Sequence, residues 1–216
     1  MNSLNLQSTL EDNITVSYFF PVPFFKFTVD LNTLSNLENA LTQLQKKHPE
    51  WNSRTSWFTP DSLHTKEPFK SWFEMHVHKK ISNILDEMRI VRKDHYLTSS
   101  WANITWGDFS HPTHLHPNAF LSGIAYIRLP PGAGKTTFDD PKDIARIVEP
   151  DLSEQNHLNT RMITANPVVG DVFVFPSYLK HSVKPGNTNA DPRISIAFNY
   201  HLRGEANRET QPYKWT

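Results

Sequence analysis

The sequence contains no cysteine, which excludes disulfide bonds, thiolate metal sites and a cysteine nucleophile. It has no excess of charge of either sign, because 22 Lys and Arg residues balance 22 Asp and Glu residues. The charge balance therefore indicates neither a nucleic-acid partner nor an anionic membrane surface. The lack of cysteine fits a reducing compartment, and we predict a cytoplasmic protein.

Long apolar runs are also missing. The stretch Phe19–Phe25 is interrupted by two prolines and is too short to cross a bilayer. Residues 1–12 have neither the basic nor the apolar segment of a secretory signal, so we expect none. Glycine is scarce, with 7 residues against 16 prolines, and aromatic residues make up 12%. This composition indicates a folded chain that is rich in loops and contains β structure.

A length of 216 residues favours a single domain over 1–216. Leu34, Leu37, Leu41 and Leu44 recur at helical spacing and predict a helix over 33–47. A second apolar stripe predicts a helix over 67–88. We therefore expect N-terminal strands and supporting helices over 1–95, a core over 96–205 and a tail over 206–216.

From residue 96 the pattern changes to short runs of β-branched and aromatic residues that turn residues separate. Such runs favour a sandwich or barrel. We predict a mainly β fold with flanking α structure, a jelly roll buttressed by the N-terminal helices. The expected strands cover 96–106, 120–129, 136–138, 171–176, 182–184 and 193–200.

Two histidines, His114 and His116, stand two residues apart. In an extended segment both side chains point to one face, so both rings can meet one ion. His181 lies far downstream, and distant strands of a sandwich can be neighbours in space. Two close ligands and one remote ligand form the layout of a facial metal site with open positions. The ordinary alternative is that these histidines are surface or hydrogen-bonded residues.

The strand predicted over 193–200 has one polar face, which carries Arg193, Ser195 and Asn199, and one apolar face. A guanidinium can bind a carboxylate through two hydrogen bonds, and a neighbouring hydroxyl can add a third. This face therefore suits a dicarboxylate ligand. An arginine on a solvated strand face is the alternative.

Together these motifs resemble the iron(II)/2-oxoglutarate-dependent oxygenases. The closer resemblance is to a branch of uncharacterised 2-oxoglutarate–iron(II) oxygenases of bacteria and phages. It covers residues 100–200 and is carried by Ser100-Trp101-Ala102-Asn103-Ile104, His114-Leu115-His116-Pro117, Leu121-Ser122-Gly123-Ile124-Ala125-Tyr126, Phe138-Asp139-Asp140-Pro141, Gly170-Asp171-Val172-Phe173-Val174-Phe175-Pro176-Ser177 with His181, and Arg193-Ile194-Ser195-Ile196-Ala197-Phe198-Asn199.

The resemblance implies a double-stranded β-helix core and an iron ion held by His114, His116 and His181. It implies that 2-oxoglutarate chelates the iron, with its far carboxylate on Arg193 and Ser195. Further cofactor contacts are expected from Asn103, Tyr126 and Asn199.

One departure from the wider superfamily concerns the ligand set. Most members have a carboxylate where this sequence has His116, so the ligands here are electrically neutral. An oxygen ligand from Asp108, Asp139 or Asp140 is an alternative, although the last two suit a turn before Pro141. His111 is another candidate ligand, but Pro112 follows it and interrupts the pairing face.

The expected reaction is oxidative decarboxylation of 2-oxoglutarate to succinate and CO₂, coupled to hydroxylation of an unidentified substrate by O₂. Substrate contacts are sought in Trp51–Trp57, Asn118 and Lys135, although residues of these kinds are more often ordinary loop residues than substrate contacts. One alternative function is a three-His, cupin-like dioxygenase or isomerase that does not use 2-oxoglutarate. Another is a non-enzymatic jelly-roll binding module. A homodimer is left open.

Overall fold

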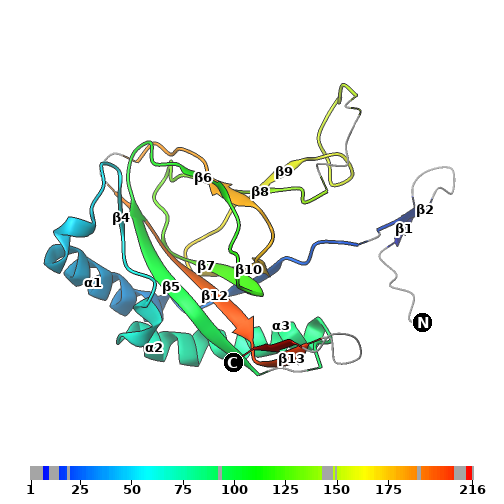
Figure 1. Cartoon of the computed structure of the whole chain (residues 1–216). Helices are drawn as coiled ribbons and strands as arrows, with labels where there is room; N and C mark the ends of the chain where they lie inside the picture. The colour runs from blue at the N-terminus through cyan, green and yellow to red at the C-terminus, as the bar shows by residue number, and fades with distance from the viewer. Residues whose placement is uncertain are drawn as a thin grey trace.

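The computed structural model describes residues 7–9, 15–18, 20–91, 94–142, 148, 150–188, 191–206 and 213–215. Two antiparallel β-sheets lie over one another, and the helices cover the outer face of the larger sheet (Figure 1). This arrangement confirms the predicted jelly roll with supporting N-terminal helices. Most of the predicted N-terminal segment 1–12 and of the tail 206–216 falls outside the described residues.

The larger sheet has six strands, in the order β3, β10, β7, β12, β5 and β4. The smaller sheet has the order β6, β11, β8 and β9. Successive strands from β5 to β8, and from β10 to β12, alternate between the two sheets. The strands are β3 (Phe25–Thr28), β4 (Ser56–Phe58), β5 (His95–Thr105), β6 (His111–His114), β7 (Leu121–Arg128), β8 (Thr136–Asp139), β9 (Met162–Thr164), β10 (Asp171–Pro176), β11 (His181–Val183) and β12 (Arg193–Leu202). Two small hairpins pair β1 (Gln7–Thr9) with β2 (Thr15–Ser17) and β13 (Gly204–Ala206) with β14 (Tyr213–Trp215).

The first helix, α1 (Leu31–Lys47), follows the N-cap Asp30, whose carboxylate accepts a hydrogen bond from the backbone N–H of Asn32. Where the sequence predicts one helix over 67–88, the chain forms α2 (Phe69–Trp72), a π-helical segment (Phe73–His78) and α3 (Lys79–Glu87) in direct succession. Apolar periodicity places this helix correctly but does not reveal its π-helical segment. Short 3₁₀ turns occupy Pro49–Trp51 and Leu63–Thr65.

The larger sheet has two different faces. On β12, Ile194, Ile196 and Phe198 join a core cluster that also contains Leu37 and Leu41 of α1. A second cluster lies on the opposite face, toward the smaller sheet, and consists of Ile124, Tyr126, Phe138, Phe173, Phe175 and Leu179. Because side chains alternate along a strand, Arg193 and Ser195 lie on this inner face. The helices therefore close the back of the larger sheet and leave its inner face for a site between the sheets.

In the part of the chain that the structure describes, no helix combines the length and the apolar character that a bilayer span needs.

We expect Leu41→Ala to reduce the free energy of unfolding by about 2–5 kcal/mol, because the side chain is fully buried between α1 and the larger sheet. Leu31→Ala is the matched control, since Leu31 belongs to the same helix and is 56% exposed. Urea unfolding of both variants measures the difference. Equal losses would contradict the packing of α1 described above.

Candidate metal centre

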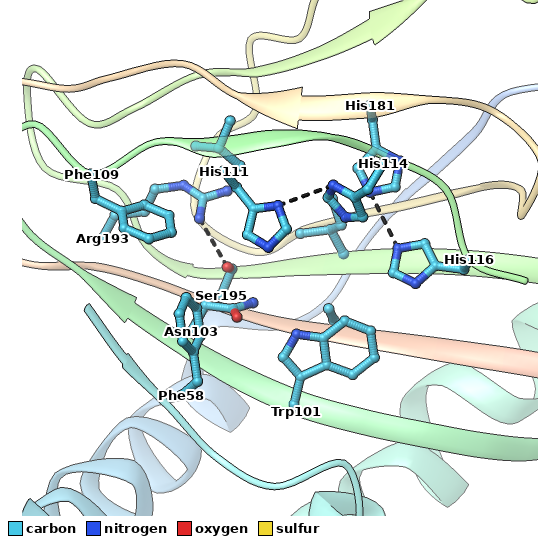
Figure 2. Close-up of a pocket in the computed structure, with 13 residues that line it drawn as sticks. Phe58, Trp101, Asn103, Phe109, His111, His114, His116, His181, Arg193 and Ser195 are labelled. Carbon is cyan, nitrogen blue, oxygen red and sulfur yellow. Dashed lines mark hydrogen bonds between the residues drawn. The ribbon is translucent and has the colours of Figure 1, made fainter. Parts of the chain in front are cut away.

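Three histidines meet at one end of a pocket between the sheets (Figure 2). His114 is the last residue of β6, and His181 is the first residue of β11. The antiparallel register sets these two residues directly opposite each other. His116 lies two residues beyond the end of β6, where its backbone N–H donates to the carbonyl oxygen of Ser177 over 3.0 Å. Each imidazole offers one nitrogen, and the three nitrogens lie within 4.8 Å of one another.

The ring orientations fit metal binding through Nε2. The Nδ1 atom of His114 lies 2.8 Å from the carbonyl oxygen of Pro112, and that of His181 lies 3.1 Å from the carbonyl oxygen of Leu179. A carbonyl oxygen can only accept, so both Nδ1 atoms carry the proton and both Nε2 atoms keep a free lone pair. The Nε2 atoms of His116 and His181 lie 3.3 Å apart.

The three imidazoles are held in the neutral form. Burial is the main cause that lowers the pKa of His116 to about 3, and the positive charges that His181 and His114 would carry contribute to this shift. Burial also lowers the pKa of His181 to about 4, and it lowers the pKa of His114. A metal ion binds neutral imidazole, so no proton has to be displaced at neutral pH.

The group contains no carboxylate among the described residues, and Asp108, Asp139 and Asp140 do not belong to it. His111, to which the sequence analysis gave less weight because Pro112 follows it, does line the pocket. Its Nδ1 lies 3.0 Å from Nδ1 of His114. His111 does not belong to the three-histidine group, and the pairing of β6 with β11 is irregular between the pairs His114–His181 and His111–Val183.

At the other end of the pocket lies a buried arginine (Figure 2). Arg193 is 3% exposed; its Nη1 donates to the Ser195 hydroxyl over 3.0 Å and its Nη2 to the Thr136 hydroxyl over 3.3 Å. Its Nε has no hydrogen-bond partner, and none of the ion pairs among the described residues includes Arg193. Burial lowers the pKa of Arg193, but a guanidinium keeps its proton. A buried cation without a counter-charge is costly, so this geometry points to a bound anion.

The other sequence-predicted cofactor contacts occupy different positions. Asn103 lines the pocket and is the register partner of Ser195. Tyr126 lies beneath Arg193, with its ring centre 5.4 Å from the guanidinium carbon, and its hydroxyl donates to Thr136. Asn199 faces His116, with its Nδ2 atom 3.5 Å from Nδ1 of that ring. Neither Tyr126 nor Asn199 is among the residues that line the pocket.

Three aromatic side chains also line the pocket: Phe58 and Trp101 lie across it from the histidines, and Phe109 lies beside His111 and Arg193 (Figure 2). The proposed substrate contacts in Trp51–Trp57, at Asn118 and at Lys135 do not line this pocket. These aromatic residues could not be distinguished in the sequence from core residues, because aromatic side chains most often contribute to a core. The one available signal was the position of Phe58, which directly follows the stretch Trp51–Trp57 that was suggested for substrate contacts.

Comparison with known proteins agrees with this geometry. Residues 99–199 match the family described as "Putative 2OG-Fe(II) oxygenase", where 2OG is 2-oxoglutarate. The matched segment contains all eight residues that the sequence analysis assigned to the site, and the match confirms the resemblance inferred from the motifs. No curated protein matches the chain.

Solved structures of such enzymes share the fold. An oxidoreductase of the 2OG-Fe(II) oxygenase family from Burkholderia pseudomallei is 14% identical, with a TM-score of 0.59 over 87% of this chain and 88% of that chain. A Pseudomonas putida prolyl-4-hydroxylase is 14% identical, with a TM-score of 0.58 over 85% of this chain and 94% of that one. HygX from Streptomyces hygroscopicus, solved with nickel and 2-oxoglutarate bound, is 13% identical, with a TM-score of 0.53 over 90% of this chain and 86% of that one.

The half-buried His116 and the buried His181 predict acid sensitivity of the metal-free protein. The pKa values of about 3 for His116 and about 4 for His181 lie below the ordinary value near 6.5. Between the folded-state pKa and 6.5, the unfolded chain therefore binds protons at these histidines that the folded chain does not bind. The free energy of unfolding should therefore fall as the pH falls from about 6.5 toward about 4. The double variant His116→Gln/His181→Asn should show a shallower slope in urea unfolding with a chelator present. Equal slopes in variant and wild type would contradict the burial described here.

Proposed function

We propose that this protein is an iron(II)- and 2-oxoglutarate-dependent oxygenase whose metal ligands are His114, His116 and His181. Arg193 and Ser195 receive the far carboxylate of 2-oxoglutarate. The observation that carries the proposal is the buried guanidinium with an unpartnered Nε in the same pocket as the three-histidine group. The family match over residues 99–199 supports an oxygenase of this class.

The donor set fits iron(II). Imidazole nitrogen is a common ligand for iron, and the three protein ligands bring no negative charge. A divalent ion on neutral ligands keeps its full charge. Together with Arg193 it would bring three positive charges to the pocket, of which the 2-oxoglutarate dianion offsets two. HygX, which has the same fold, was crystallised with nickel and 2-oxoglutarate bound.

The residues around Arg193 fit a carboxylate. Ser195 and Thr136 are both buried and hold the two terminal nitrogens of the guanidinium, which fixes the plane of the group. Tyr126 supports the guanidinium from below through a cation–π contact. Asn103, on the neighbouring strand β5, offers an amide to the same part of the pocket. Thr136 was not recognised from the sequence.

When bound, iron(II) supplies the activation of O₂ that couples oxidative decarboxylation of 2-oxoglutarate to hydroxylation of a substrate. The residues of this chain bind and orient. The backbone carbonyls of Pro112 and Leu179 keep the His114 and His181 rings in the ligating tautomer. The wall formed by Phe58, Trp101 and Phe109 limits the access of water to the centre.

The alternatives explain less of the site. A cupin-like enzyme that does not use 2-oxoglutarate leaves Arg193 without a role, and a non-enzymatic jelly roll leaves the three neutral histidines without one. The cytoplasmic location stays a prediction, and the primary substrate and a homodimer stay open.

The first test is the visible absorption band of the iron(II)–2-oxoglutarate chelate. Under anaerobic conditions the wild type should develop this weak band when both are added. His181→Ala should abolish it, because His181 supplies one of the three ligands. A wild type that shows no band at saturating concentrations would sink the proposed function.

The second test concerns the anion site. Arg193→Gln should raise the dissociation constant for 2-oxoglutarate at least about 30-fold, since losing one partner of a buried charge pair costs about 2–5 kcal/mol. Arg128→Gln is the matched control, because Arg128 lies on β7 outside the pocket and pairs with Glu38 of α1. Titration of the anaerobic chelate band gives both constants. Equal constants in Arg193→Gln and wild type would remove Arg193 from the co-substrate site.

A further inference from the structure

We propose that Asn199 is the positioning residue of His116 and that its side-chain amide selects the tautomer in which His116 binds metal. This inference rests on the proposed ligand role of His116. It gives Asn199 the role of orienting the metal ligand His116 and not of binding the co-substrate.

His116 differs from the other two histidines in what faces its Nδ1. In His114 and His181 a backbone carbonyl oxygen lies at this position and fixes the proton there. In His116 the neighbouring group is the Asn199 amide, whose Nδ2 lies 3.5 Å from Nδ1. The Nε2 of His116 points instead toward Nε2 of His181, 3.3 Å away. The Nε2 atom of His116 therefore faces the other two histidines, and its Nδ1 atom faces Asn199.

A ring that binds metal through Nε2 carries its proton on Nδ1, and this proton needs an acceptor. An amide NH₂ group cannot accept, whereas the amide oxygen can. Rotation of the Asn199 amide by half a turn about its last side-chain bond exchanges Nδ2 and Oδ1. The oxygen then faces His116 and accepts the Nδ1 proton.

The surroundings of Asn199 allow both orientations. Asn199 is flanked in register by Ser99 on β5 and Ser122 on β7. In the structure its Nδ2 donates to the Ser99 hydroxyl over 3.0 Å, and its Oδ1 accepts from the Ser122 hydroxyl over 2.7 Å. A hydroxyl group can both donate and accept, so the rotated amide keeps both partners, with Ser99 donating and Ser122 accepting.

The hydrogen-bond chain returns to the segment that carries His116. The hydroxyl of Ser122 lies 2.8 Å from that of Ser177, and either oxygen can be the donor. The carbonyl oxygen of Ser177 accepts the backbone N–H of His116. Ser122, Ser177 and Asn199 are 1%, 2% and 7% exposed. A buried polar network is costly unless each member is satisfied, and these serines satisfy it in both directions.

The first experiment needs no variant. Zn(II) is a diamagnetic probe that suits imidazole ligands. Two-bond ¹H–¹⁵N correlation spectra of histidine-labelled protein, with and without Zn(II), report which ring nitrogen carries the proton. We expect the Zn(II)-bound protein to carry the His116 proton on Nδ1. A proton on Nε2 of His116 in the Zn(II)-bound protein would overturn the proposal.

The second experiment compares Asn199→Leu with Asn199→Asp. Leucine has a similar size but no acceptor, so we expect a Zn(II) dissociation constant about 10–100-fold above that of the wild type. Aspartate accepts without rotating, and its constant should stay within about threefold of the wild type. Thr98→Val is the control, because the Thr98 hydroxyl donates to the backbone oxygen of Asn199 and not to its side chain. Its constant should equal that of the wild type.

The outcomes separate this inference from the proposed function. A network that only joins the three strands would make Asn199→Asp as weak as Asn199→Leu, and this result overturns the proposal. An Asn199→Leu variant that binds Zn(II) as tightly as the wild type also overturns the proposal, but it leaves the proposed metal site intact. A wild type that does not bind Zn(II) removes the proposed metal site and this inference together.

Discussion

The antiparallel pairing of β6 with β11 is the constraint on which the site depends. It places His181 opposite His114, although 66 residues separate them in the chain. The smaller sheet that contains these strands lies over the inner face of the larger sheet, where β12 carries Arg193. The helices pack on the outer face of β12, and the inner face carries Arg193 and Ser195 into the pocket. The register of β6 with β11 and the packing of the two sheets thus bring the three histidines and Arg193 into a single pocket.

The described residues that line the pocket carry little charge of their own. The three candidate ligands His114, His116 and His181 are neutral, the only permanent charge among the lining residues is the guanidinium of Arg193, and none of the lining residues is a carboxylate. Superfamily members with a carboxylate ligand neutralise part of the metal charge with the protein. In the proposed site His116 stands at that position, so the three protein ligands neutralise none of the metal charge and the co-substrate would neutralise most of it. Metal and co-substrate should therefore favour each other's binding more strongly than in carboxylate-bearing relatives.

Apolar periodicity predicted α1 and the two faces of β12, because each depends on which residues a single element must bury. The spacing of His114, His116 and His181 predicted a group that the structure does assemble. The surroundings of each side chain could not be predicted in the same way. Alternation places Asn199 on the inner face, but only the sheet register shows that its neighbours are Ser99, Ser122 and His116. Thr136 escaped notice for the same reason, since its contact with Arg193 joins two different sheets.

The aromatic wall of the pocket is built apart from the main core. Phe58 ends the edge strand β4 and Phe109 lies in the turn after β5, and their rings meet edge to face with centres 5.7 Å apart. Neither belongs to the cluster that joins the helices to the larger sheet. Changes here touch the pocket without opening a cavity in that cluster, so they cost little of the margin by which the fold is stable. Substitutions at Phe58 and Phe109 can therefore reshape the pocket while the core between the helices and the larger sheet stays packed.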